Sequence, residues 1–257
     1  MRIGRRNFRQ VKQLLLKGNP YKAIPRIFQV HYKPLRVIFE ELFSLGSYPW
    51  TLRLRAPTGD VQARVYSGAD LSTANLVFCR EDYHMPSGAR VVVDIGSNIG
   101  LSSLYWLTRN TEVHVYCYEP APTSYQRLLE NLRPYGGRFT PYNVAVSDFR
   151  GTARLWVDPT GVKSSLDHSE RVAEPVDVGV SHVNDILEAV VSQRGRIDML
   201  KLDNEGHEFR TLTAIAPEFW ERITCVNVGC HDNRAAVPPA FHETRVGSAE
   251  RFIRHQG

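Results

Sequence analysis

The fold of this chain is decided by the stretch Arg90-Val91-Val92-Val93-Asp94-Ile95-Gly96-Ser97-Asn98-Ile99-Gly100. Three valines in a row predict a short strand that is buried on both faces, as in a parallel sheet. Asp94 ends this strand, and Gly96 and Gly100 frame a tight turn before residues 101–107, which have helical spacing. A strand, a glycine-rich turn and a helix in this order let the backbone approach a nucleotide-like ligand closely.

An acidic residue follows the next predicted strand. This strand spans residues 113–118, and Glu119 comes directly after it. A carboxylate about 20 residues beyond a glycine turn is placed to accept hydrogen bonds from the two hydroxyls of a ribose. The alternative is an ordinary strand-to-helix turn followed by a surface glutamate. Because the glycine turn and Glu119 follow two successive predicted strands at the expected spacing, together they favour the ligand site.

The residues missing from the turn indicate which ligand it holds. A dinucleotide fingerprint has a second glycine where the pyrophosphate approaches the backbone, and this chain has Asn98 at that position. A P-loop is excluded because no Gly-Lys-Ser or Gly-Lys-Thr follows. A ligand with ribose and adenine but no phosphate fits better, which indicates S-adenosylmethionine. Asp94 would then face the amino end of its methionine part.

Four stretches of the chain resemble the motifs of a known family, in the same order. They are Val93-Asp94-Ile95-Gly96-Ser97-Asn98-Ile99-Gly100, Tyr118-Glu119-Pro120, Asn143-Val144-Ala145-Val146-Ser147-Asp148, and Leu200-Lys201-Leu202-Asp203-Asn204-Glu205-Gly206-His207-Glu208. The family is the FkbM family of class I S-adenosylmethionine-dependent methyltransferases. The resemblance implies a doubly wound, Rossmann-like α/β fold with a mostly parallel sheet. It also implies O-methylation of a small natural product or sugar moiety, such as a polyketide, glycoside or glycolipid.

The resemblance and the rule that ligands bind at the carboxyl ends of parallel strands give a set of candidate site residues. Those expected to contact the cofactor are Glu81, Asp94, Gly96, Ser97, Asn98, Gly100, Glu119, Pro120, Asn143, Ala145 and Asp203. Methylation of a hydroxyl also needs a group that takes its proton. The candidates for this base are Asp203, Glu205 and His207, with His231 as a further one. The alternative for Glu205 is a structural role on the first turn of a helix, and the alternative for His207 is a partly exposed helix residue.

A metal-assisted reaction is an alternative mechanism. Asp203 after one strand and Asp232 and Asn233 after the next resemble the oxygen ligands of catechol-type methyltransferases. A Mg²⁺ ion held there would lower the pKa of the acceptor hydroxyl. Because a His-Asp-Asn sequence in a loop also arises easily by chance, we assign no metal ligand.

Other classes of protein fit the sequence less well. An oxidoreductase that uses NAD is disfavoured by Asn98 in the glycine turn. A methyltransferase of nucleic-acid bases is disfavoured because Asp203-Asn204-Glu205-Gly206 stands where an Asn-Pro-Pro-Tyr-like motif is expected. A relative that binds the cofactor without catalysing a reaction stays open. Family members commonly carry a glutamate near the end of the last parallel strand, where this chain has Asn227 and Gly229.

Length and composition indicate one sizeable core in a chain of 257 residues. The sequence has no run of about 18 apolar residues, so we expect no transmembrane helix. It also shows no recognisable secretory signal. The four cysteines lack metal-type spacing, and Cys117 and Cys225 fall within apolar strand patterns. We therefore expect Cys117 and Cys225 to be buried free thiols and the location to be cytoplasmic. We expect a small hydroxylated substrate and no nucleic-acid partner, and the oligomeric state is not predicted.

The basic residues are concentrated at the N-terminus. Residues 1–39 contain ten Lys or Arg and no Asp or Glu, although the whole chain has a net charge of only +5. We divide the chain into a basic helical arm with a hairpin, residues 1–70, and a methyltransferase domain, residues 71–257. Phe8, Val11, Leu14 and Leu15 share one face of a predicted amphipathic helix. Capping the domain, peripheral contact with an anionic membrane and gathering a negatively charged partner are the open roles of this arm.

Two segments beyond the glycine turn have weak patterns. Residues 158–174 are polar and without clear periodicity, and we expect them to form part of the substrate-binding wall. The tail, residues 234–257, shows no convincing pair of strands. The sheet is therefore expected to be truncated at this edge, with a helix from about Phe241 as the alternative.

Overall fold

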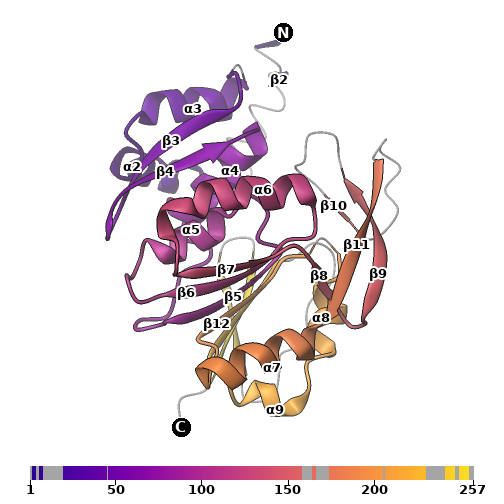
Figure 1. The fold of residues 1–257 in the computed structure, drawn as a ribbon. Coiled ribbons are helices and arrows are strands. Elements are labelled where there is room, and N and C mark those ends of the chain that lie inside the picture. The colour runs from indigo at the N-terminus through magenta and orange to yellow at the C-terminus, as the bar shows by residue number, and fades with distance from the viewer. Residues whose placement is uncertain are drawn as a thin grey trace. The chain divides into compact units, whose positions relative to one another are not determined.

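The computed structural model describes residues 2–3, 6–7, 20–44, 46–157, 164–165, 174–204, 206–229, 241–246 and 249–254. They form two compact units, Met1–Glu81 and Asp82–Gly257, which are described separately (Figure 1). The division lies at Glu81, beyond the boundary at residue 70 that we drew from the sequence, because α4 (Gly68–Phe78) packs on elements of the first unit.

The N-terminal unit is built on a hairpin of β3 (Trp50–Ala56) and β4 (Gly59–Val65). Leu52 and Leu54 of β3 and alternate residues of β4 are buried, whereas the residues between them are exposed. This confirms the predicted hairpin with one solvated face. The other elements are β1 (Arg2–Ile3), β2 (Arg6–Asn7), α2 (Pro20–Val30), α3 (Pro34–Phe43) and α4. The amphipathic helix predicted around Val11 lies outside the described residues.

The second unit contains a sheet of seven strands among the described residues, in the order β14-β15-β13-β12-β5-β6-β7. The strands are β5 (Val91–Ile95), β6 (His114–Tyr118), β7 (Phe139–Tyr142), β12 (Met199–Leu202), β13 (Cys225–Gly229), β14 (Phe241–Val246) and β15 (Ala249–Arg254). From β13 to β7 all neighbours are parallel, and β15 and β14 are antiparallel. The predicted doubly wound, mostly parallel α/β fold is confirmed.

Helices cover both faces of this sheet (Figure 1). α5 (Leu101–Leu107) and α6 (Pro122–Leu132), which leads into the short η1 (Arg133–Tyr135), lie on one face. α7 (Val183–Arg194) and α9 (Pro217–Trp220) lie on the other, and α8 (Glu208–Thr213) follows β12. The main core on the α7 face includes Val91, Val93 and Ile95, which are alternate residues of β5. Asp94, between them in the alternation, therefore points to the α5 face.

A smaller sheet of order β10-β9-β11-β8 stands beside the main one. Its strands are β8 (Ala145–Ser147), β9 (Gly151–Val157), β10 (Ser164–Ser165) and β11 (Glu174–His182). Of the polar segment 158–174, Ser164 and Ser165 pair with β9, and nearly all of the rest lies outside the described residues. The proposed substrate wall stays a prediction.

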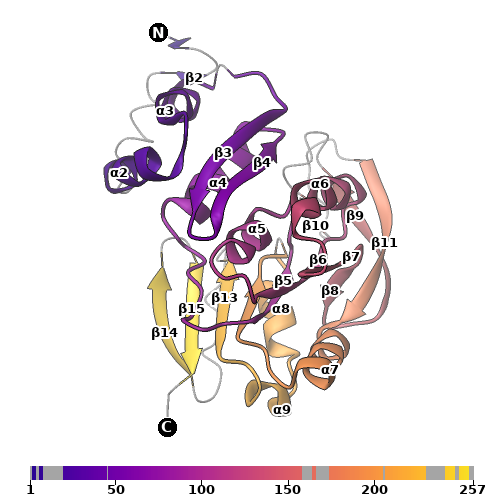
Figure 2. The same ribbon diagram turned by 60° about the vertical axis from the view of Figure 1, so that its left-hand side comes forward.

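The expectation of a truncated sheet edge or a helical tail is wrong. β14 and β15 form an antiparallel hairpin that extends the sheet next to β13, as Figure 2 shows. Phe241 and Phe252 are buried in the main core. Two apolar anchors suffice for an edge hairpin, and the charged residues between them obscure the alternation that a strand prediction relies on.

Two expectations from composition can also be compared with the structure. Among the described residues, no helix is both long and apolar enough to cross a membrane. Cys79, Cys117 and Cys225 are buried free thiols, as predicted for Cys117 and Cys225.

Candidate functional site

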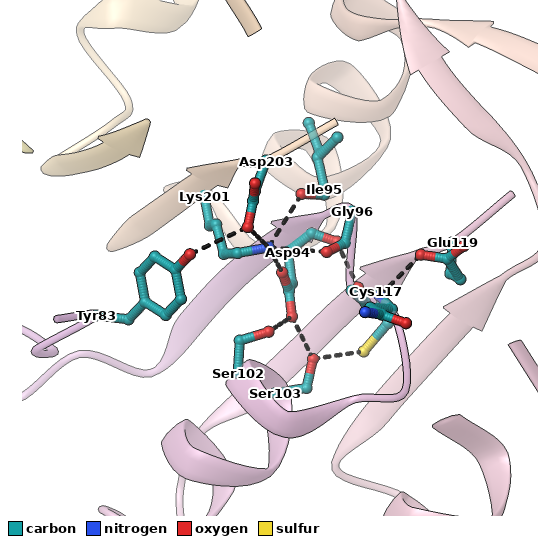
Figure 3. Close-up of polar contacts among 12 residues, drawn as sticks. Tyr83, Asp94, Ile95, Gly96, Ser102, Ser103, Cys117, Glu119, Lys201 and Asp203 are labelled. Carbon is teal, nitrogen blue, oxygen red and sulfur yellow. Dashed lines mark hydrogen bonds and ion pairs between the residues drawn. The ribbon is translucent and has the colours of Figure 1, made fainter. Parts of the chain in front are cut away.

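A buried lysine lies at the centre of the candidate site (Figure 3). Lys201 on β12 is 2% exposed. Its Nζ donates hydrogen bonds to Oδ1 of Asp94 at 3.0 Å and to the carbonyl of Gly96 at 2.8 Å. The carboxylate of Asp203 lies 3.6 Å from the same nitrogen. Lys201 therefore joins the end of β5 to the end of β12.

Asp94 is fully buried and has partners within the chain for both carboxylate oxygens. While Lys201 binds Oδ1, the hydroxyls of Ser102 and Ser103 each donate to Oδ2 at 2.6 Å. Both serines lie on the first turn of α5, so Asp94 fixes this helix to the sheet. A buried carboxylate is tolerated only with such partners. The predicted contact of Asp94 with the amino end of a cofactor stays a prediction.

The charges around Lys201 keep it protonated. Burial alone would lower its pKa, but the carboxylates of Asp94 and Asp203 outweigh burial and hold the pKa of Lys201 above its ordinary value. Tyr83 donates its hydroxyl to Oδ2 of Asp203 at 3.0 Å. Burial, reinforced by the charge of Asp203, raises the pKa of Tyr83 well above its ordinary value. The site thus contains a fixed ammonium and a neutral phenol, both beside Asp203.

The turn after β5 has the geometry that its two glycines permit. Gly96 has φ +75°, and a Cβ atom there would lie 1.9 Å from the carbonyl oxygen of Asp203. Gly100 has φ +84°, and a Cβ would lie 3.2 Å from Leu128 of α6. The first glycine therefore allows β12 to end against the turn, and the second allows α6 to pack on it. The backbone N–H groups of Gly96 and Ser97 both donate to the carbonyl of Tyr118.

Asn98 and Glu119 meet at the end of β6. The backbone N–H of Asn98 donates to Oε2 of Glu119 at 2.8 Å, and that of Ala121 donates to Oε1 at 2.9 Å. Burial raises the pKa of the Glu119 carboxyl to about 7, although these two hydrogen bonds oppose the shift. In the part of the chain that the structure describes, Oδ1 of Asn98 is buried without a hydrogen-bond partner.

The remaining predicted cofactor residues differ in where they lie. Ser97 is buried and donates its hydroxyl to the carbonyl of Asp94 at 2.7 Å. Asn143 donates its amide to the carbonyls of Glu119 at 2.8 Å and Pro120 at 3.0 Å, which fastens the turn after β6. Ala145 packs in the core of the small sheet. Glu81 belongs to the N-terminal unit, where it pairs with Arg26 at 2.6 Å. Cofactor contacts of these residues stay predictions.

The three candidates for the base differ in accessibility. The side chain of Asp203 is 27% exposed. His207 directly precedes α8 and is buried. Its Nδ1 lies 3.5 Å from the hydroxyl oxygen of Ser147. Glu205 lies outside the described residues, as does His231. Of the two candidates that the structure describes, Asp203 is therefore the one that a substrate can reach more directly.

No metal centre is formed within the described part of the chain, where no group of three or more His, Cys, Asp or Glu is placed to hold an ion. Asp203 belongs to this part, but Asp232 and Asn233 do not. The structure therefore does not decide the metal-assisted alternative.

The sequence analysis missed the central lysine and its neighbours. Lys201 was named only within the fourth family-like stretch, and Ser102 and Ser103 were covered only by the predicted helix of residues 101–107. A usable signal was present, since a lysine within an otherwise apolar strand must find a carboxylate. Asn227 of β13 pairs in register with Lys201 and is fully buried. Neither of its amide atoms has a hydrogen-bond partner among the described residues.

Comparisons with known proteins show which family the chain resembles. The family described as methyltransferase FkbM domain matches residues 94–251. The chain is 27% identical over 212 residues to the 31-O-demethyl-FK506 methyltransferase FkbM of Streptomyces tacrolimicus. The aligned region covers 70% of this chain and 81% of that protein. It is 28% identical over 180 residues to the methyltransferase sdnD of Sordaria araneosa, covering 58% and 69%. It is 25% identical over 122 residues to the hexuronic acid methyltransferase AglP of Haloferax volcanii, covering 48% of each.

The close approach at Gly96 can be tested with a matched pair of substitutions. Gly96→Ala should lower the free energy of unfolding by more than about 4 kcal/mol, because its Cβ meets a backbone oxygen that cannot move aside. Gly137→Ala is the control, since Gly137 has φ +81° with no atom near its Cβ position. It should cost only about 1–2 kcal/mol for the left-handed conformation. Urea unfolding measures both, and equal losses would show that β12 does not end against the turn.

The ion pair of Lys201 can be tested in the same way. Lys201→Met should lower the free energy of unfolding by about 3–5 kcal/mol, because it leaves Asp94 buried without its counter-charge. Lys33→Met, at an exposed lysine, is the control and should leave stability unchanged. The double variant Lys201→Met/Asp94→Asn should lose less than Lys201→Met alone. A double variant at least as unstable as the sum of the two single ones would contradict the pairing.

Proposed function

The chain belongs to the methyltransferase FkbM family, and on this premise we propose that it transfers the methyl group of S-adenosylmethionine to a hydroxyl oxygen of a small natural product or sugar moiety. The names of two relatives support the acceptor class. One is named for a substrate that lacks an O-methyl group, and the other for a hexuronic acid. A polyketide, glycoside or glycolipid hydroxyl is the common chemistry that we assign to this chain.

The observation that carries the proposal is the meeting of Glu119 with the turn between Gly96 and Gly100. A carboxylate offers about four lone-pair sites, and backbone N–H groups use one on each oxygen of Glu119. The remaining sites suit two ribose hydroxyls. The buried Oδ1 of Asn98 offers a further acceptor at the same place. The residues present therefore fit an adenosine ligand without phosphate, and Glu119, Asn98 and the backbone of Gly96 would hold it.

The bound cofactor supplies a methyl group already activated by a positively charged sulfur. The chain's own task is to position the acceptor oxygen in line with that group and to remove its proton. We assign the proton to Asp203. Tyr83 and Lys201 fix the orientation of its carboxylate through Oδ2, and the ammonium favours the charged form, which can accept a hydrogen bond from the hydroxyl. The proton would pass to Asp203 as the C–O bond forms and the methyl–sulfur bond of the donor breaks, which would leave a neutral thioether, and the proton would then pass to solvent.

The product distinguishes the proposed reaction from other methyl transfers. Methyl-labelled S-adenosylmethionine is incubated with the protein and a panel of hydroxylated polyketides and uronic-acid glycosides. A methyl ether survives mild alkali, whereas a methyl ester of a uronic acid releases methanol. Alkali-stable label in the acceptor supports hydroxyl methylation. Label that alkali removes would replace the proposed acceptor group with a carboxylate.

Glu119→Ala should weaken the binding of S-adenosylmethionine by about 1–3 kcal/mol, the cost of losing a buried hydrogen-bonding carboxylate. Glu112→Ala, at an exposed glutamate next to β6, is the matched control and should bind normally. Because only the ionised carboxylate accepts from both hydroxyls, affinity should rise as the pH increases through about 7, the pKa of Glu119. This dependence should be absent from Glu119→Ala. Calorimetric titration measures both effects, and unchanged affinity would remove the ribose assignment.

Asp203→Asn should lower kcat by about a hundredfold or more, the usual contribution of a positioned base, and change cofactor affinity much less. His207→Ala is compared in the same assay. A larger loss of kcat in His207→Ala, with cofactor binding retained, would transfer the role of base to the histidine. If neither substitution lowers kcat, the base lies elsewhere. Activity that persists after EDTA treatment would remove the metal-assisted alternative.

A further inference from the structure

The two helices α2 and α3 of the N-terminal unit carry an unusual surface. Among the described residues, six large hydrophobic side chains are exposed, and four of them lie between residues 28 and 39. They are Phe28, Tyr32, Leu35 and Phe39. We call this surface, together with the neighbouring Lys33 and Arg36, the α2–α3 face.

The acidic residues of α3 are turned the other way. Glu40 is 6% exposed, whereas Leu35 is 70% exposed. Glu40 accepts hydrogen bonds from the hydroxyl of Tyr48 at 3.0 Å and from the backbone N–H of Gly46. Glu41 accepts from the amide of Asn75 at 2.9 Å. The helix thus holds these two carboxylates against its own unit beside Val37, whereas Leu35 and Phe39 are exposed, which is unusual for large apolar residues of a surface helix.

Basic residues predominate on this face, where the carboxylate of Asp60 accepts a hydrogen bond from Tyr32 and pairs with Arg53. Lys33 and Arg36 are exposed between the apolar residues, and the guanidinium of Arg36 lies 4.1 Å from the centre of the Trp50 ring. That of Arg55 lies 4.1 Å from the centre of the Tyr32 ring. Residues 1–39 contain no acidic residue at all. Exposed apolar side chains among basic ones are the pattern of helices that lie in a membrane interface.

We propose that the α2–α3 face docks on an anionic phospholipid membrane. Leu35 and Phe39 enter the boundary between headgroups and acyl chains, and Lys33 and Arg36 contact lipid phosphates. Charge decides between this partner and a second copy of the chain, because two such faces would bring like charges together. The aliphatic Leu35, which is 70% exposed, favours lipid over nucleic acid, because the phosphates of a nucleic acid offer it no apolar contact. The inference does not depend on the proposed function.

Flotation of the full chain with lipid vesicles tests the inference. The protein should float with vesicles of phosphatidylcholine and phosphatidylglycerol and not with phosphatidylcholine alone, and added salt should weaken binding. Leu35→Ser/Phe39→Ser should lower partitioning by about tenfold or more, through the loss of buried apolar area. Lys33→Gln should lower it about fivefold, the effect of one basic residue at such a surface. Phe209→Ser, at an exposed aromatic residue of the other unit, is the control and should float normally.

Several results would overturn the inference. Equal flotation with neutral vesicles would remove the role of charge. Flotation that Arg5→Gln/Arg6→Gln/Arg9→Gln abolishes, but that Leu35→Ser/Phe39→Ser does not change, would place lipid contact in the preceding segment. Without flotation, a dimer that Leu35→Ser/Phe39→Ser dissociates in the ultracentrifuge would assign the face to a second copy. Without flotation, a gel shift with RNA would assign it to nucleic acid. The unfolding midpoint of each variant verifies that it is folded.

Discussion

The buried ion pair between Lys201 and Asp94 is the interaction on which the candidate site depends. Removing each charge from water costs several kcal/mol. The structure offsets this cost with a full set of partners, namely two serine hydroxyls for Asp94 and two backbone carbonyls for Lys201. Because apolar residues of similar volume could stabilise the sheet equally well, stability alone does not explain the pair. What it adds is a positive charge fixed beside the turn and beside Asp203.

The ligand turn and the proposed base therefore share one framework. The backbone of Asp203 presses on Gly96, while its side chain lies beside Gly229, where a Cβ would come within 2.7 Å of Oδ1. Any shift of β12 moves both the turn that would hold the methyl donor and the carboxylate that would receive the proton. Transfer between two bound groups is sensitive to small errors in their separation. A common anchor for both groups is a physical means of limiting such errors.

The features that the sequence predicted are those with local signals. The glycine turn, the carboxylate of Glu119 and the order of strands and helices each follow from a pattern within a few residues. The pair of Lys201 and Asp94 joins positions 107 residues apart, and it becomes visible only once β5 and β12 are aligned in register. The C-terminal hairpin was missed for a related reason, because Phe241 and Phe252 become core residues only against strands formed much earlier in the chain.

The register also gives a physical meaning to the residues by which this chain departs from its family. A glutamate in place of Asn227 would bring a third carboxylate next to Lys201, which Asp94 and Asp203 already approach. A neutral amide avoids that excess of buried negative charge. At Gly229, the missing side chain leaves room for the Asp203 carboxylate. Both departures are therefore compatible with the proposed role of Asp203 as the base.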